Sequence, residues 1–359
     1  MSSAAVTSAD AGAEAELRRW IDELIAARWR GARAGRVVML KGDASNRRFW
    51  RVVLEPRPRR APASAIAVDL GPDDLPAYVR ALSLVPAPPS EPPFLNVQRF
   101  LKSIGAAVPE IYAAAAERRM LLVEDVGELS LFDAALRRLD KPAALYRAAV
   151  DELLLIHVEG TRRLDNRCIA ASITYDERLF RWEMEQFLEA GAASFGRTID
   201  AHALAPELDQ LAARLGRIPR VLSHRDYHGH NLFLQSGRVR VIDFQDALLA
   251  PAAQDLAVLL TTRDTDRVID LAAETRLLDY YMAGLTRRGA PCPEAGEFRE
   301  GYRLCVLQHA LKVIGRFNVL ERQGKSGYAA FIPHAVGQAR RMLAHHREFP
   351  RLRATFEAA

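Results

Sequence analysis

Cysteine is scarce in this 359-residue sequence. The three cysteines, Cys168, Cys292 and Cys305, are odd in number and lie far apart in the chain. This spacing argues against a disulfide framework and against a CxxC metal site, and it is typical of a protein kept in a reducing compartment. We therefore expect a cytoplasmic protein.

Long apolar runs are also missing. No run approaches the roughly 18 residues that a membrane-spanning helix needs, so we expect no membrane segment. Residues 1–15 are small and polar, and they lack the basic flank and apolar core of a signal peptide. We therefore predict that residues 1–15 form a disordered tail.

Lysine is rare, and no cluster of positive charge replaces it. Five lysines are scattered over the chain, the other basic residues are arginines, and the net charge is only +5. No basic arm occurs and no aromatic residues alternate with a basic patch, so we expect no nucleic-acid partner. The simplest interpretation is that the arginines lie on solvent-exposed faces of the protein.

The chain has the composition of a globular protein, with 49% hydrophobic and 26% charged residues, and its length suits two lobes. Its first third reads as β-rich and the rest as helical, which predicts an α+β fold with an N-terminal lobe at 16–126 and a helical lobe at 127–359. The expected strands are 36–40, 49–54, 65–69, 111–112 and 120–124, in an antiparallel sheet. The expected helices are 17–34, ended by Gly35, and 96–105, 131–139, 143–159, 176–190, 205–214, 253–260, 265–283, 297–320 and 328–347.

The most informative stretch is a polar loop followed by a short hairpin between Ser223 and Asp243. A buried strand at 221–222 leads into the loop, and strands at 232–234 and 239–242 flank a turn at Ser236-Gly237. Folding about this turn places Asn231 almost opposite Asp243, at the open end of the hairpin. Asp226 then lies in the loop just outside.

These three residues have the chemistry that phosphoryl transfer requires. A carboxylate such as Asp226 can orient an attacking hydroxyl, and the oxygens of Asn231 and Asp243 are ligands that Mg²⁺ prefers. Alone, Asp226 would be read as a turn aspartate that caps its own backbone. Its position five residues before Asn231 favours the catalytic interpretation.

Neighbouring polar residues have two interpretations each. His224 and His228 have a spacing that suits zinc only on a helix, which the glycine-containing loop is not, so we expect His224 to support the loop through backbone contacts. Asp255 is either a first-turn helix carboxylate or a group that holds the catalytic loop from behind. Gln245 and Asp246 are either turn residues or groups that support the metal site.

A second loop, at 42–48, lies between two strands of the N-terminal lobe and contains Ser45, Asn46, Arg47 and Arg48. Small residues at such a place can bring backbone N–H groups to nucleotide phosphates, and the two arginines can add charge-assisted contacts. The signal is weak, because small polar residues mark any hairpin. No Walker A sequence occurs anywhere in the chain.

The motifs resemble those of the aminoglycoside phosphotransferase/choline kinase family, whose members have the bilobal protein-kinase-like fold. Within it they are most similar to the bacterial anomeric kinases of N-acetylmuramate and N-acetylglucosamine. The resemblance covers roughly residues 17–347. The segments that carry it are Gly42–Phe49, Asp226-Tyr227-His228, Asp243–Ala247 and Leu311–Phe317.

The resemblance implies a role for each matching residue. Asp226 would be the catalytic base, supported by Arg225 and His228, and Asn231 with Asp243 would bind Mg²⁺. The segment 123–126, with Glu124 and Val126, would be the hinge whose backbone meets the adenine of ATP. One departure is clear: the third strand of the N-terminal lobe carries no lysine, so either Arg47 and Arg48, or the loop backbone together with metal ions, would hold the phosphates.

Three functions remain open at this stage. The first is an ATP-dependent kinase that phosphorylates the anomeric hydroxyl of an N-acetylated amino sugar in peptidoglycan recycling, acting as a monomer. The second keeps the fold and changes the acceptor to an aminoglycoside, choline or a similar alcohol. The third is a pseudokinase scaffold, which only the missing lysine favours.

Overall fold

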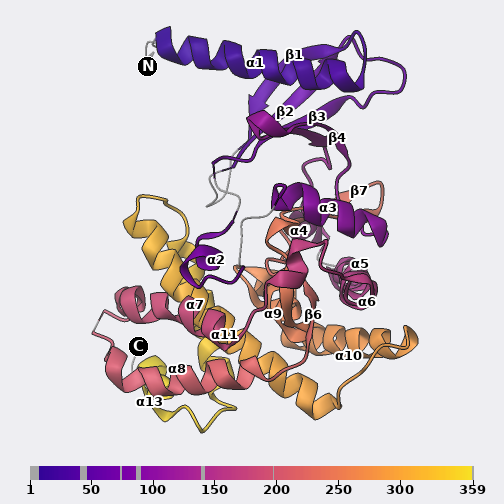
Figure 1. The fold of residues 1–359 in the computed structure, drawn as a ribbon. Helices are drawn as coiled ribbons and strands as arrows, with labels where there is room; N and C mark the ends of the chain where they lie inside the picture. Colours follow the sequence, from indigo (N-terminus) through magenta and orange to yellow (C-terminus); the bar gives the residue numbers. More distant parts are fainter. Residues whose placement is uncertain are drawn as a thin grey trace. The chain divides into compact units, whose positions relative to one another are not determined.

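The computed structural model describes residues 8–40, 47–72, 75–85, 90–138, 142–196 and 198–357. Contacts between residues divide the chain into two compact units, 1–74 with 109–126 and 75–108 with 127–359. The first contains a sheet and the second is mainly helical, so the α+β prediction is confirmed (Figure 1). Ser45 and Asn46 lie outside the described residues.

The first unit is built on a five-stranded sheet in which all neighbouring strands are antiparallel. The strand order is β1-β2-β3-β5-β4. The strands are β1 (Arg33–Met39), β2 (Arg48–Glu55), β3 (Ser64–Asp69), β4 (Ile111–Ala115) and β5 (Met120–Glu124), and η1 (Ala116–Arg118) joins the last two. The predicted sheet is therefore present, with strands a few residues longer than the apolar runs alone indicate.

Helix α1 (Ser8–Arg28) packs against this sheet (Figure 1). Ile21 and Ile25 on the helix and Trp29 directly after it meet Trp50 and Val52 of β2 in one buried cluster. Removing this apolar surface from water is the main force that holds the helix on the sheet.

Two predicted boundaries of this helix are wrong. The helix begins at Ser8, inside the stretch expected to be a tail, and it ends at Arg28 instead of near Gly35. The chain leaves the helix through Gly31, whose φ of +83° is a conformation that glycine adopts without strain. The remaining residues before β1 are therefore a turn.

The second unit consists mostly of helices. They are α2 (Ala77–Ala81), α3 (Pro93–Ser103), α4 (Leu131–Arg137), α5 (Pro142–Leu155), the π-helical η2 (Ile156–Gly160), α6 (Thr161–Arg163), η3 (Ile169–Ser172), α7 (Glu177–Ala190), η4 (Gly191–Ser194), α8 (Ala201–Gly216), η5 (Phe244–Asp246), α9 (Ala252–Thr261), η6 (Thr265–Arg267), α10 (Leu271–Arg287), α11 (Ala295–Arg322), η7 (Ala329–Phe331), α12 (Ile332–Leu343) and α13 (Pro350–Glu357). Two pairs of short strands complete it: β6 (Arg220–Ser223) with β9 (Leu248–Pro251), and β7 (Leu232–Gln235) with β8 (Arg238–Val241).

Two long predicted helices are interrupted. The segment 265–283 is a short 3-10 turn followed by α10, which begins after Asp270 because the side chain of Asp270 accepts a hydrogen bond from the Ala273 N–H at 2.6 Å. The segment 328–347 likewise divides into η7 and α12, which ends at Leu343. A side-chain cap therefore sets the start of α10.

Residues 75–108 group with the helical unit, whereas the sequence placed them in the N-terminal lobe. The reason is the apolar face of α3, where Phe94, Val97 and Leu101 are buried. The Phe94 ring packs 5.0 Å from the ring of Phe244, centroid to centroid, next to the polar hairpin. Burial of this face attaches the segment to the second unit.

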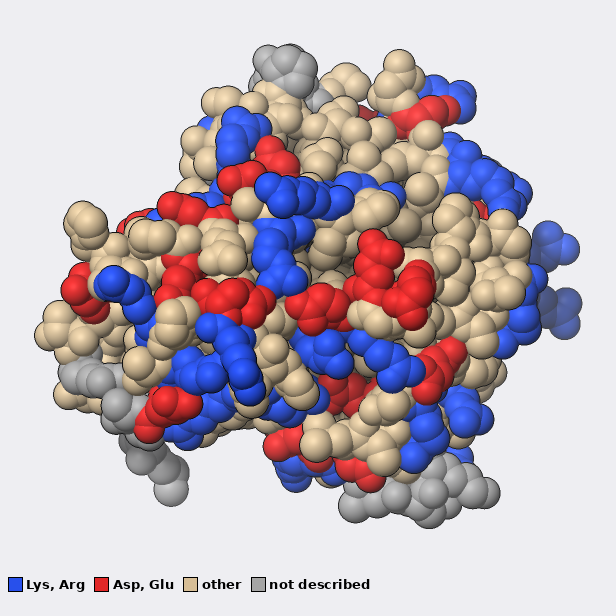
Figure 2. All heavy atoms as spheres, turned by 90° about the horizontal axis from the view of Figure 1, so that it is seen from below, with Lys and Arg blue, Asp and Glu red and all other residues tan. Residues whose placement is uncertain are grey.

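The surface of the molecule mixes both signs of charge. On the face in Figure 2, basic and acidic side chains lie next to one another. Several of the arginines form ion pairs; Arg214, for example, pairs with both Glu300 and Glu348. In such pairs the positive charge of the arginine is balanced by neighbouring carboxylates. In the described part of the chain, no helix is both long and apolar enough to cross a membrane.

A close crossing of α7 and α11 in the second unit provides a stability prediction. At Gly315 of α11, a Cβ atom would lie 2.4 Å from the backbone N of Phe187 on α7. Gly315→Ala should therefore lower the free energy of unfolding by about 1–3 kcal/mol, because backbone cannot move aside as a side chain does. Chemical denaturation of both proteins measures this difference.

Gly337 on α12 is the matched control. A Cβ there meets nothing within 4 Å, so Gly337→Ala should stabilise by up to about 1 kcal/mol through helix propensity alone. Equal effects of the two substitutions would contradict the packing that we describe.

Candidate active site

The site is built on the β7–β8 hairpin, which forms as the sequence predicts. Leu232 pairs with Val241 and Gln235 with Arg238, leaving a two-residue turn. The φ angles of Ser236 and Gly237 are +51° and +77°, the positive pair that a type I′ turn requires. The twist of such a turn matches the twist of the strands and fixes their register.

The register brings three polar residues together at the open end of the hairpin. The Ile242 N–H donates to the carbonyl oxygen of Asn231 at 3.0 Å, so Asn231 lies beside Asp243. The Asn231 amide nitrogen is 3.5 Å from Oδ2 of Asp243 and donates to the backbone oxygen of Asp226 at 3.0 Å. Asp226, Asn231 and Asp243 therefore form one cluster.

Two residues of this region have backbone conformations that side chains disfavour. Arg225 has a φ of +77° and Asp243 a φ of +64°. Such angles cost of order 1–3 kcal/mol and persist only where the surroundings enforce them. At Asp243 the chain turns directly from β8 into η5, which aims the carboxylate at Asn231.

Asp255 enforces the loop conformation from behind. Its side-chain oxygens accept the backbone N–H groups of His224 and Arg225, both at 2.8 Å. His157 approaches the same carboxylate at 3.0 Å and contacts the Tyr281 hydroxyl at 2.8 Å with its other ring nitrogen. Asp255 is completely buried on α9, and its side chain binds the loop in place of its own helix.

These partners set the charge of Asp255. Burial raises the pKa of the carboxyl group, but the hydrogen bond and charge of His157 oppose this, and the net pKa is lowered. The group is therefore an anion that satisfies two buried N–H donors.

The supporting residues connect the loop to the hairpin. The Nε2 atom of His224 lies 2.9 Å from the Ile242 carbonyl oxygen, and the Gln245 amide donates to Oδ1 of Asp243 at 3.1 Å. His228 is buried with Nε2 3.4 Å from the Asn231 amide, and burial lowers its pKa. Asp246 acts electrostatically on Arg225.

Among the described residues, the histidines of this loop belong to no group of three converging metal-type ligands. Over the described ranges, the group of three metal-type ligands that converges is Glu300, His346 and Glu348. The guanidinium of Arg214 already pairs with both of these glutamates. The cluster is therefore an ion-pair network of the helical unit.

A buried glutamate that the sequence analysis did not assign lies beside the catalytic loop. Glu183 of α7 accepts from Arg225 Nη2 at 2.8 Å and pairs with Lys312 Nζ of α11 at 3.2 Å. Its other oxygen accepts from the hydroxyl of Tyr175 and from the Gln308 amide. Burial raises the pKa of Glu183, but the charges of Lys312 and then Arg225 outweigh it and bring the pKa to about 2.

The sequence did contain a signal for these residues. Glu183 lies among Leu179, Met184 and Phe187 on the buried face of α7, where a carboxylate is out of place unless it has partners. Lys312 similarly follows buried Leu311, and it is one of only five lysines. Neither pattern identifies the partner, because the pairing needs the tertiary fold.

Asp226 itself is open to an incoming group. It is half-buried, and its carboxylate has no hydrogen-bond donor in the part of the chain that the structure describes. Burial raises its pKa, but the positive charges of Lys312 and Arg225 are stronger and lower the pKa overall. The group is an anion with free lone pairs, as an acceptor-orienting residue must be.

The remaining predicted residues belong to the first unit. Arg48 pairs with Asp69 at 2.6 Å across β2 and β3, and Glu124 at the end of β5 donates its N–H to Glu110 at 2.8 Å. Arg47 is half-buried and Val126 is buried. Strand β3 contains no lysine. The nucleotide contacts of these residues stay predictions.

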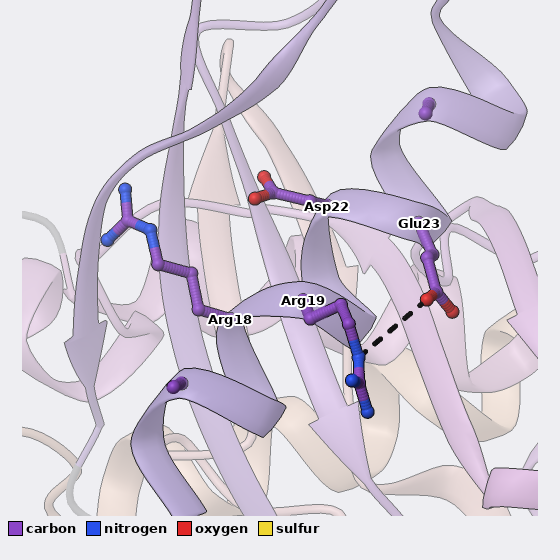
Figure 3. Close-up of a pocket in the computed structure, with 6 residues that line it drawn as sticks. Arg18, Arg19, Asp22 and Glu23 are labelled. Atoms are coloured by element: carbon purple, nitrogen blue, oxygen red, sulfur yellow. Dashed lines mark ion pairs between the residues drawn. The ribbon is translucent and has the colours of Figure 1, made fainter. Parts of the chain in front are cut away.

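A surface hollow of the first unit lies on α1 (Figure 3). Its polar side chains are occupied by structural contacts: Arg18 donates to the Ala34 carbonyl at 2.6 Å, and Asp22 accepts from the Ala34 N–H at 2.5 Å. Arg19 and Glu23 pair at 4.0 Å. These contacts attach α1 to β1 and form no reactive group.

The side chains of Asn231 and Asp243 at the end of the hairpin offer the kind of ligand that Mg²⁺ prefers. Mg²⁺ requires hard oxygen ligands, and a carboxylate and an amide that lie 3.5 Å apart can reach one ion when the amide presents its oxygen. Asn231 and Asp243 therefore fit this ion better than zinc or copper.

The fold and this site define the class of kinase-like phosphotransferases. The model of the phosphotransferase enzyme family matches residues 36–294, and the chain belongs to this family. An N-acetylmuramate/N-acetylglucosamine kinase of Caulobacter vibrioides is 29% identical over 327 residues, which cover 82% of this chain and 84% of that protein. Three further curated proteins of the same name are 28% to 30% identical.

Solved structures agree on the fold. A choline kinase from Cryptosporidium parvum superposes with a TM-score of 0.60 at 12% identity, covering 90% of this chain and 93% of that one. A spectinomycin phosphotransferase, solved in complex with ADP and spectinomycin, has a TM-score of 0.54 at 13% identity and covers 95% and 98%. At these identities the likeness shows the architecture alone.

The lowered pKa of Glu183 predicts how stability depends on pH. A carboxyl group whose pKa falls on folding, here from 4.5 to about 2, stabilises the protein above its unfolded pKa. This stabilisation, about 3 kcal/mol, is lost as the pH falls from 4.5 towards 2. Urea unfolding of wild type and Glu183→Gln should show a difference that is largest near pH 6 and shrinks below pH 4.5.

Glu185 of the same helix is the control. Its pair with Arg181 is partly exposed to solvent, so Glu185→Gln should change the unfolding free energy by less than about 1 kcal/mol at every pH. A Glu183→Gln effect that does not vary with pH would contradict the buried ion cluster.

Proposed function

We propose that this protein is an ATP- and Mg²⁺-dependent kinase that phosphorylates the anomeric hydroxyl of N-acetylmuramate and N-acetylglucosamine. The shared name of the curated relatives supports this acceptor. The nucleotide is supported by the ADP in the related spectinomycin phosphotransferase. We further propose a cytoplasmic monomer that serves peptidoglycan recycling.

The observation that carries the proposal is the charge around Asp226. Two cations, Arg225 and Lys312, share the carboxylate of Glu183 beside the catalytic loop. The segment at 175–189 adds Arg178 and Arg181 with their own acidic partners. Carboxylates outnumber the arginines in 175–189, but Arg225 and Lys312 place two cations beside the loop of Asp226, which favours a neutral or anionic sugar over a polycation.

Asp226 would act by orienting the acceptor. An anomeric hydroxyl is more acidic than an ordinary alcohol, so a carboxylate with a low pKa suffices to accept its hydrogen bond and to take the proton late in the transfer. Asp255 keeps this carboxylate in place by binding the preceding two backbone N–H groups. Positioning therefore contributes much of the rate.

Asn231 and Asp243 would hold the Mg²⁺, which supplies charge neutralisation on the nucleotide phosphates when bound. Gln245 keeps the Asp243 carboxylate oriented by its hydrogen bond to Oδ1. The absent lysine of β3 leaves Arg47, Arg48 and the 42–48 loop backbone as the phosphate-binding groups of the first unit.

One assay separates this function from the alternatives. ADP release should require Mg²⁺ and occur with N-acetylmuramate and N-acetylglucosamine, and it should stop when the reducing end of either sugar is blocked as a methyl glycoside. Turnover with kanamycin or choline alone would contradict the acceptor. Absence of turnover with every acceptor would favour the scaffold.

Asp226→Asn tests the catalytic residue within the same assay. It preserves size and removes the negative charge, so kcat should fall by roughly 10²–10⁴-fold while the protein stays folded. Asn231→Ala should instead raise the Mg²⁺ concentration needed for half-maximal rate. An Asp226→Asn enzyme with wild-type kcat would refute the assigned role.

A further inference from the structure

We propose that Lys312 is a positioning residue of the active site, which keeps a positive charge beside the Asp226 carboxylate and so lets an anionic phosphoryl group approach it. The inference rests on the proposed kinase function. It assigns a role to a residue of α11, far in sequence from the catalytic loop.

The geometry ties Lys312 to the loop through one carboxylate. Lys312 Nζ lies 3.2 Å from Oε1 of Glu183, and the same oxygen accepts from Nη2 of Arg225 at 2.8 Å. Arg225 directly precedes Asp226. The ammonium group of Lys312 is therefore linked through the Glu183 carboxylate to Arg225, the residue that precedes Asp226.

Glu183 is held rigidly, so it can hold Lys312 in turn. It is only 3% exposed, and its second oxygen is occupied by the Tyr175 hydroxyl and by the Gln308 amide at 3.2 Å. Gln308 lies one helical turn before Lys312 on α11. The close crossing of α7 and α11 at Gly315 fixes the two helices on which Glu183 and Lys312 stand.

Of the two cations that pair with Glu183, Lys312 has the more exposed side chain. Arg225 is buried, with its guanidinium 4.0 Å from the ring centre of Tyr78. Burial and then Lys312 lower the pKa of His309 to about 3, so that ring is neutral. The Lys312 side chain keeps 19% of its surface exposed, and its ammonium acts on both Glu183 and Asp226.

The physical need for such a charge follows from the reaction. The Asp226 carboxylate must lie close to the hydroxyl that attacks a phosphoryl group, so two anionic groups approach each other in a site of low dielectric constant. A fixed ammonium group beside the carboxylate offsets this repulsion without any reorganisation during the transfer. Lys312 would therefore act mainly on kcat.

Lys312→Met is the direct test, because it keeps the aliphatic stem and removes the charge. We expect kcat to fall by about 30-fold or more while the KM values of ATP and sugar change less than about threefold, the pattern of an interaction made in the transition state. Lys312→Arg should recover at least about a tenth of the wild-type kcat, because charge and reach are kept. Thermal unfolding reports the folded fraction.

Arg316→Met is the matched control. Arg316 lies one turn further along α11 and makes no hydrogen bond or ion pair with Glu183 or Arg225 among the described residues, so its kcat should stay at the wild-type value. A Lys312→Met enzyme with kcat within about twofold of wild type would overturn the proposal. A defect seen with N-acetylmuramate and absent with N-acetylglucosamine would also overturn it, because Lys312 would then bind the acceptor carboxylate.

The experiments distinguish an error in the role of Lys312 from an error in the proposed substrate. The wild-type rates alone decide whether amino sugars are acceptors. The same variants are also compared in basal ATP hydrolysis, in which water is the acceptor. An equal loss of hydrolysis in Lys312→Met would support the role of Lys312, and unchanged hydrolysis would refute it.

Discussion

The buried carboxylate of Asp255 is the constraint on which the active site depends. It binds two successive N–H groups at His224 and Arg225, and these bonds hold Arg225 at a positive φ that a side chain otherwise avoids. Asp226 follows immediately. The direction of the Asp226 carboxylate is therefore set by a residue on α9, which His157 and Tyr281 hold in turn.

A second buried carboxylate organises the charges of the same loop. Glu183 satisfies Arg225 and Lys312 together, and breaking such a pair leaves an uncompensated buried charge. Asp255 therefore fixes the loop backbone, whereas Glu183 fixes the cations around it. The chain uses two helices, α7 and α11, to supply groups that the short catalytic loop does not contain.

The sequence predicted the local parts of this account and missed the distant ones. The hairpin, with Asn231 opposite Asp243, follows from strand periodicity and a Ser-Gly turn, which act over a few residues. Lys312 is 129 positions from Glu183, as the numbering shows, so no local pattern could pair them. The attachment of 75–108 to the helical unit was missed for the same reason, because burial of the apolar face of α3 against distant elements decides it.

The central claim is that Asp226 delivers an anomeric hydroxyl to the nucleotide. Proton–phosphorus correlation NMR of a reaction with ATP, Mg²⁺ and N-acetylmuramate tests it most directly, because the correlation identifies the proton on the phosphorylated carbon. The account predicts a phosphomonoester signal that correlates with the anomeric proton. A correlation with another ring proton or with the protons of the primary alcohol, or no new signal, would contradict it.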